Sequence, residues 1–270
     1  MKMPPDLDTA QAPEVFTRLL AIVDELREKC PWDQKQTMES LRHLTIEETF
    51  ELSEAILEGD MTEIKKELGD VLLHILFYTR IAAEKHAFTI TEVIQSLCEK
   101  LIYRHPHIYG QQEAQDSEAV EQNWEKRKLQ ENQNRSVLGG VPSSLPSLIK
   151  AARIKEKARR VGFDWQEQEA AWQKVQEEME ELRQEVKQPS PTPTQQEKVQ
   201  EEFGDLLFAL VSYASFIEVN PEDALEKANK KFIRRFQYVE QQVAQQGQQL
   251  TQLSPQALQR YWEEAKKQPR

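Results

Sequence analysis

The pattern of apolar positions along the chain predicts helices. In "EEFGDLLFALVSYASFI", residues 201–217, the apolar side chains point in all directions and leave no polar stripe. This segment therefore predicts a helix at the centre of a bundle. Alternating strand patterns are absent, and the composition is dominated by Glu, Gln, Lys, Leu and Ala, which favour helix. We predict an all-α fold.

The chain repeats itself. The segment "KELGDVLLHILFYTRIA" (66–82) aligns with 201–217, and in both segments the motif Glu-x-Gly-Asp precedes the apolar run. Two further pairs of segments align in the same order: "EETFELSEAI" (47–56) with "EEMEELRQEV" (177–186), and "KLIYR" (100–104) with "KFIRR" (231–235). The repeat predicts two copies of one helical unit.

A segment with paired glycines and two prolines, "ENQNRSVLGGVPSSLPSL" (131–148), predicts a linker between the copies. We therefore predict two tandem helical-bundle domains, at 1–130 and 149–270. The second domain carries a proline-rich loop at 188–196, which joins its two acidic helices and is longer than the corresponding turn of the first.

Charge and composition exclude several classes of function. The net charge of −11 argues against nucleic acid or an anionic membrane surface as a partner. No apolar run reaches the roughly 20 residues of a membrane span, and the N-terminus lacks the apolar core of a signal peptide. Only Cys30 and Cys98 occur, without a pairing motif, which is typical of a reducing compartment. We expect a cytoplasmic protein.

Acidic residues occur in pairs three positions apart, so both members of a pair share one helix face. The pairs are Glu48 with Glu51, Glu67 with Asp70, Glu178 with Glu181, and Glu202 with Asp205. If the two helices of each repeat pack antiparallel, their pairs converge on a cluster of four carboxylates. Burying one uncompensated carboxylate costs on the order of 20 kcal/mol before relaxation, so the cluster requires a cation or protonation.

The available ligands select the cation. All five histidines lie in the first repeat, and the second repeat contains neither His nor Cys, so its cluster offers only oxygen. Oxygen ligands favour hard ions, which predicts Mg²⁺ or Mn²⁺. Calcium has suitable ligands too, although no EF-hand loop is present.

A carboxylate-rich metal site attracts ligands that arrive with their own metal, and polyphosphates do so. Lys231 and Arg235 lie four residues apart on one helix face and can hold phosphate oxygens, as can Lys100 and Arg104 at the aligned positions. The competing interpretation is that the acidic stripes and basic pairs are ordinary solvated surfaces. Recurrence of the complete acidic pattern next to an apolar helix favours the site.

The acidic pattern resembles that of the MazG family of nucleoside triphosphate pyrophosphohydrolases, in its tandem two-domain form. The family motif is EExxE followed by ExxD, and it occurs twice, with Glu47 and Glu177 as the first acid of each copy. Further family-like segments are "CPWD" (30–33), "KLIYRHPHIYG" (100–110), "VGFDW" (161–165) and "KANKKFIRRF" (227–236). The likeness covers nearly the whole chain.

The resemblance implies an all-α enzyme that hydrolyses nucleoside triphosphates, with magnesium, to the monophosphate and pyrophosphate. Carried over by motif, the four acidic pairs would bind metal, Lys231 and Arg235 would contact phosphate, and Trp262 would lie near the nucleotide. Family members assemble as homodimers or larger oligomers. We further hypothesise that Glu47 and Glu177 position the attacking water or support the metal ligands.

Alternatives stay open at this stage. One is a narrower helical phosphohydrolase acting on dUTP or phosphoribosyl-ATP. Another is a non-catalytic helical scaffold whose acidic clusters bind ions. The sequence decides neither the preferred base and sugar nor which repeat is active, because both copies retain every acid of the motif.

Overall fold

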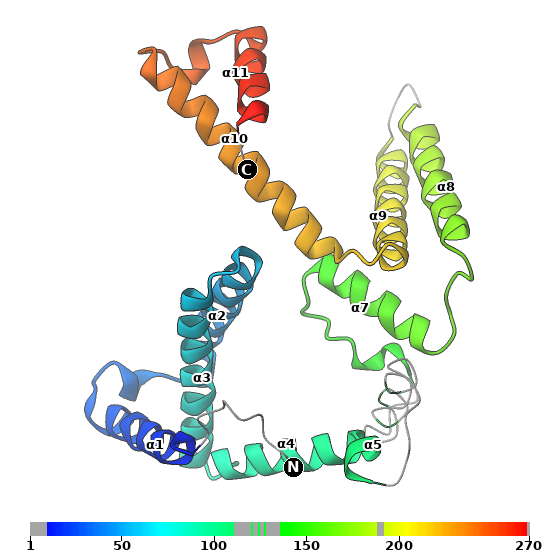
Figure 1. Cartoon of the computed structure of the whole chain (residues 1–270). Coiled ribbons are helices and arrows are strands. Elements are labelled where there is room, and N and C mark those ends of the chain that lie inside the picture. Colours follow the sequence, from blue (N-terminus) through cyan, green and yellow to red (C-terminus); the bar gives the residue numbers. More distant parts are fainter. Residues whose placement is uncertain are drawn as a thin grey trace. The chain divides into compact units, whose positions relative to one another are not determined.

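Every regular element in the described part of the computed structural model is a helix, which confirms the predicted all-α fold (Figure 1). The structure describes residues 10–110, 120, 124, 127, 136–187 and 192–268. The chain divides into two compact units, Met1–Gln115 and Asp116–Arg270. The exact domain limits read from the sequence stay a prediction, because much of 111–135 lies outside the described residues.

Unit 1 is built on a hairpin of two helices. Its elements are α1 (Ala12–Lys29), η1 (Asp33–Lys35), α2 (Met38–Glu58), α3 (Met61–Glu84), α4 (Ile90–Arg104) and α5 (Pro106–Tyr109). Helix α2 ends at Gly59, whose φ of 71° suits glycine, and Asp60 then caps α3 by accepting from the backbone N–H groups of Thr62 and Glu63. This tight turn forces α2 and α3 to run antiparallel, side by side (Figure 1).

The core of unit 1 lies between α2 and α3. Leu41, Phe77 and Ile81 are at most 3% exposed and form one cluster. Helix α1 packs against α3, and the ion pairs Arg27–Glu84 and Asp24–Arg80 join the two helices at their edges. The hairpin is therefore held in a fixed register, which positions the side chains that α2 and α3 direct toward each other.

Unit 2 repeats the hairpin and adds a long helix. Its elements are η2 (Leu138–Gly140), α7 (Ser147–Arg160), α8 (Gln168–Val186), α9 (Pro193–Phe216), α10 (Pro221–Gln245), η3 (Leu250–Gln252) and α11 (Pro255–Lys267). Helices α8 and α9 lie side by side, α7 packs on α9, and α10 contacts α7 and α11. Part of the predicted linker folds onto α7, where Lys150 Nζ donates to the Ser143 carbonyl.

Helix α9 differs from its prediction in one respect. The sequence predicted burial on every side, whereas in the single chain the burial of α9 is incomplete. Ala209, Val211 and Ala214 are buried, but Phe203 and Leu207, nearer the start of the helix, remain 52% and 45% exposed. The reason is that α8 and α7 cover part of the helix, and the sequence pattern alone does not tell which neighbours a single chain supplies.

Candidate metal centres

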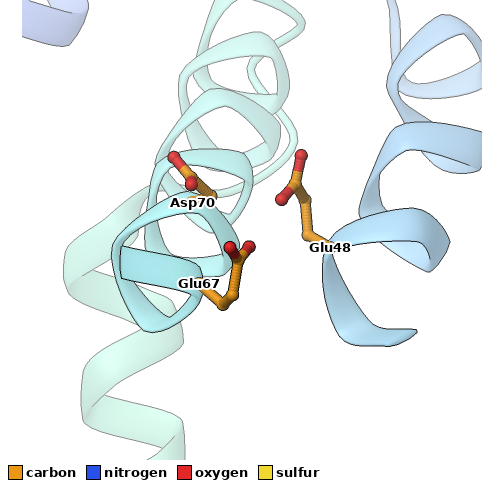
Figure 2. A group of neighbouring side chains, drawn as sticks. All are labelled: Glu48, Glu67 and Asp70. Carbon is orange, nitrogen blue, oxygen red and sulfur yellow. The ribbon is translucent and has the colours of Figure 1, made fainter. Parts of the chain in front are cut away.

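Three carboxylates converge between α2 and α3 in unit 1. Figure 2 shows Glu48 on α2 facing Glu67 and Asp70, which lie one turn apart on α3. One oxygen from each side chain lies within 4.8 Å of the others. The antiparallel hairpin brings these residues together, as expected from their spacing, and the arrangement suits a bound cation.

Burial and mutual repulsion strain this cluster electrostatically. Glu67 is 3% exposed, and its Oε2 is buried without a hydrogen-bond partner among the described residues. Its other oxygen accepts from Lys66 Nζ at 2.8 Å. Burial, followed by the neighbouring charges of Asp70, Glu51 and Glu67, raises the pKa of Glu48 above its ordinary value. A divalent ion would relieve both the repulsion and the unpaired oxygen.

Unit 2 carries a second cluster of the same kind. Oxygens of Glu178 and Glu181 on α8 and of Glu202 on α9 lie within 4.8 Å of one another. Glu178 is 6% exposed and pairs with Lys174 Nζ at 2.8 Å. Partial burial raises the pKa of Glu202, and the nearby charges of Glu181 and Glu178 raise it further.

Each cluster gathers three carboxylates, whereas the sequence predicted four. Glu51 in unit 1 and Asp205 in unit 2 are exposed and fall outside the groups within 4.8 Å. Both charges nevertheless act on their clusters, because Glu51 contributes to the raised pKa of Glu48 and Asp205 to that of Glu202. Their role as metal ligands stays a prediction.

The two glutamates predicted to position water directly precede a cluster residue in the sequence. Glu47 and Glu177 are exposed, and Glu177 pairs with Lys174 at 2.7 Å. Lys174 therefore bridges Glu177 and Glu178, and its pKa is raised by these two hydrogen bonds. Sequence reasoning missed Lys174 and Lys66, although spacing was a signal for Lys174, which precedes Glu178 by one helical turn.

The predicted phosphate-binding residues lie on other helices. Lys231 is exposed and Arg235 half-buried on α10, while Lys100 is exposed and Arg104 half-buried on α4. Trp262 on α11 packs against the core of Val239, Val243 and Ala265, with its ring 5.0 Å from that of Phe232. Its observed contacts are those of a packing residue, and its role near a nucleotide stays a prediction.

The raised pKa values predict that metal binding weakens at a higher pH than for ordinary carboxylates. A protonated glutamate cannot bind the ion, so affinity falls as the pH drops through the raised pKa values of Glu48 and Glu202. Titration of Mn²⁺ between pH 4 and pH 8, with free Mn²⁺ followed by electron paramagnetic resonance, measures this. A midpoint at or below the ordinary glutamate value of about 4.3 would contradict the prediction.

The sequence model of the MazG nucleotide pyrophosphohydrolase domain matches this chain twice, at residues 36–109 and 166–240. The chain belongs to the MazG family. Each MazG domain contains one acidic cluster, so the duplication inferred from the sequence is confirmed.

Two relatives match nearly end to end. The chain is 44% identical over 257 residues to the nucleoside triphosphate pyrophosphohydrolase/pyrophosphatase MazG of Thermotoga maritima, covering 93% of this chain and 96% of that one. It is 37% identical over 257 residues to a nucleoside triphosphate pyrophosphohydrolase of Escherichia coli, covering 93% and 97%. A crystal structure of a mazG-related protein from Thermotoga maritima aligns with 42% of this chain and 97% of its own, at 29% identity and a TM-score of 0.38.

Within the described residues, no helix combines the length and apolarity needed to cross a membrane.

Proposed function

We propose that the chain is a metal-dependent nucleoside triphosphate pyrophosphohydrolase that converts nucleoside triphosphates to monophosphates and pyrophosphate. The observation that carries this proposal is the three-carboxylate cluster, which recurs between two antiparallel helices in each MazG domain. The names of the nearly full-length Thermotoga maritima and Escherichia coli relatives support it.

The residues present fit Mg²⁺ or Mn²⁺. Glu48, Glu67 and Asp70 would hold the ion in unit 1, and Glu178, Glu181 and Glu202 in unit 2, with only oxygen donors in each group. The buried, unpartnered Oε2 of Glu67 is an atom that such an ion would satisfy. When bound, the ion supplies charge neutralisation and Lewis acidity toward a polyphosphate.

The remaining residues act on water and phosphate in this proposal. The reaction adds one water across the bond between the α and β phosphates. Glu47 and Glu177 directly precede the cluster residues Glu48 and Glu178 in the sequence, and in this proposal they would orient that water and accept its proton, or support the metal ligands. Lys231 with Arg235, and Lys100 with Arg104, would bind phosphate oxygens, and Trp262 would lie near the nucleotide.

A homodimer is part of the proposal. Phe203 and Leu207 on α9 are four residues apart and therefore share an exposed apolar face with Leu210, which is 42% exposed. The position of unit 1 that aligns with Phe203 is also apolar and exposed, since Leu68 on α3 is 53% exposed. Burying such faces against a second copy would complete the burial that the apolar pattern predicted.

A substrate panel tests the activity. We expect the protein with Mg²⁺ to release pyrophosphate and the matching monophosphate from all eight common ribo- and deoxyribonucleoside triphosphates, measured by ion-exchange chromatography of the products. Cleavage of dUTP or phosphoribosyl-ATP alone would favour a narrower phosphohydrolase. Release of orthophosphate as the primary product would refute cleavage between the α and β phosphates, and absence of any product would favour the scaffold.

A further inference from the structure

The two acidic clusters use different members of the repeated motif. The repeat aligns Asp70 with Asp205, yet Asp70 belongs to the cluster of unit 1 and Asp205 lies outside that of unit 2. Asp70 is half-buried beside Glu48 and Glu67 (Figure 2), whereas Asp205 is exposed. The same aspartate is therefore held in one unit and turned outward in the other, so its surroundings must differ between them.

One polar side chain next to Asp70 has no counterpart in unit 2. His74 lies one helical turn after Asp70 on α3, so the two side chains share a face of that helix. The aligned residue in unit 2 is Ala209, whose side chain has no polar atom. Ala209 and Asp205 both line a cavity of about 570 Å³. Asp205 thus lacks a side-chain hydrogen-bond donor one turn along its own helix.

His74 is buried with an unsatisfied ring nitrogen. Its side chain belongs to a residue that is 8% exposed, and its Nδ1 is buried without a hydrogen-bond partner among the described residues. Burial lowers the pKa of His74, and the charge of Asp70 acts in the opposite direction, so the carboxylate is close enough to act on the ring. A buried polar group without a hydrogen bond is unfavourable, and the Asp70 carboxylate is a suitable acceptor for the ring.

We propose that His74 is a positioning residue, which holds Asp70 in the unit 1 metal centre by donating a ring N–H to one oxygen of its carboxylate. The other oxygen is then left to bind the ion. A neutral imidazole supplies one N–H donor, and hydrogen bonds of this kind orient carboxylates that bind metals. The inference rests on the metal binding of the proposed function and is independent of the hydrolysis.

Replacement of His74 tests this role. The reference protein carries Glu178→Gln and Glu202→Gln, so that Mn²⁺ binding, followed by electron paramagnetic resonance, reports on unit 1. In that background His74→Leu keeps a buried side chain but removes the donor, and we expect it to weaken Mn²⁺ binding by about 10- to 100-fold. His74→Gln keeps an N–H donor, and we expect it to restore most of the affinity.

Two comparisons separate positioning from packing. His43→Leu is the matched control, because His43 is exposed on α2 and outside the cluster, and it should bind Mn²⁺ as the reference does. We expect His74→Leu to unfold at a urea concentration no lower than the reference, since it removes a buried unsatisfied nitrogen. Equal weakening of Mn²⁺ binding by His74→Leu and His74→Gln would show that His74 acts through packing, and the proposal would be wrong.

A measurement on the wild type does not require that a leucine variant folds. An imidazole N–H that is buried and bonded to a carboxylate exchanges slowly with water. We expect NMR spectra of the protein with Mg²⁺ to show one such ring N–H signal that is missing from His74→Gln. Its absence from the wild type would overturn the proposal.

The outcomes also distinguish this role from the proposed function. If the reference protein binds Mn²⁺ and His74→Leu binds it equally well, the positioning role is refuted, whereas the metal binding of the proposed function stands. If the reference protein binds no Mn²⁺, the metal centre of unit 1 falls and the positioning role falls with it.

Discussion

The Glu67→Gln, Glu202→Gln double variant is expected to lose at least about 100-fold in the rate of pyrophosphate release. Each substitution replaces one carboxylate of a cluster with a neutral amide of the same shape. Weaker metal binding removes charge neutralisation where the phosphates must bind, and this accounts for the size of the effect. Pyrophosphate release and Mn²⁺ binding are measured together.

Glu197→Gln is the matched control, because Glu197 lies exposed on α9 less than two turns before Glu202 and outside the cluster. It should retain wild-type turnover. The two single variants then assign activity to unit 1, to unit 2, or to both. A double variant that stays folded, by circular dichroism, and still turns over at the wild-type rate would show that the clusters are not the catalytic centres.

Phe77→Ala is expected to destabilise unit 1 by about 3 to 5 kcal/mol. The Phe77 ring is 3% exposed and packs with Leu41 and Ile81, so truncation leaves a cavity between α2 and α3. These helices also carry the unit 1 cluster, and we expect metal binding there to weaken as the hairpin loosens. Urea unfolding followed by circular dichroism measures the loss of stability.

Phe88→Ala is the matched control for stability, since Phe88 is 41% exposed in the same unit. Its effect should lie within about 0.5 kcal/mol. If Phe77→Ala unfolds at the same urea concentration as this control, the core does not hold the hairpin in the way described.

The sequence predicted the hairpins and most of each cluster, because residue spacing determines which side chains share a helix face. It did not predict that Glu51 and Asp205 fall outside the groups. Residues three apart on a helix differ by about 60° in direction, so the two members of an acidic pair need not both point into the space between the two helices. Which of them turns away depends on the rotation of each helix about its axis, and packing rather than spacing sets that rotation.

The cavity of about 570 Å³ that α7, α8 and α9 line in unit 2 could not be predicted from the sequence either. Ala171 and Ser212 are ordinary small residues on two separate helices, and they form a hollow only once α8, α9 and α7 are packed in register. In the repeat, Ala171 aligns with Leu41 and Ser212 aligns with Phe77 of the first copy. The smaller side chains of the second copy indicate a cavity only when both positions are known to face the same space.

The lysines beside the clusters affect how the protein tolerates loss of its metal. Lys66 contacts Glu67 at 2.8 Å and Lys174 contacts Glu178 at 2.8 Å, so each buried glutamate has a positively charged partner on its own helix. Zinc fingers, by contrast, unfold without their metal because metal binding supplies their folding free energy. We expect the two hairpins to stay folded when the metal is removed, so that metal loss would be reversible.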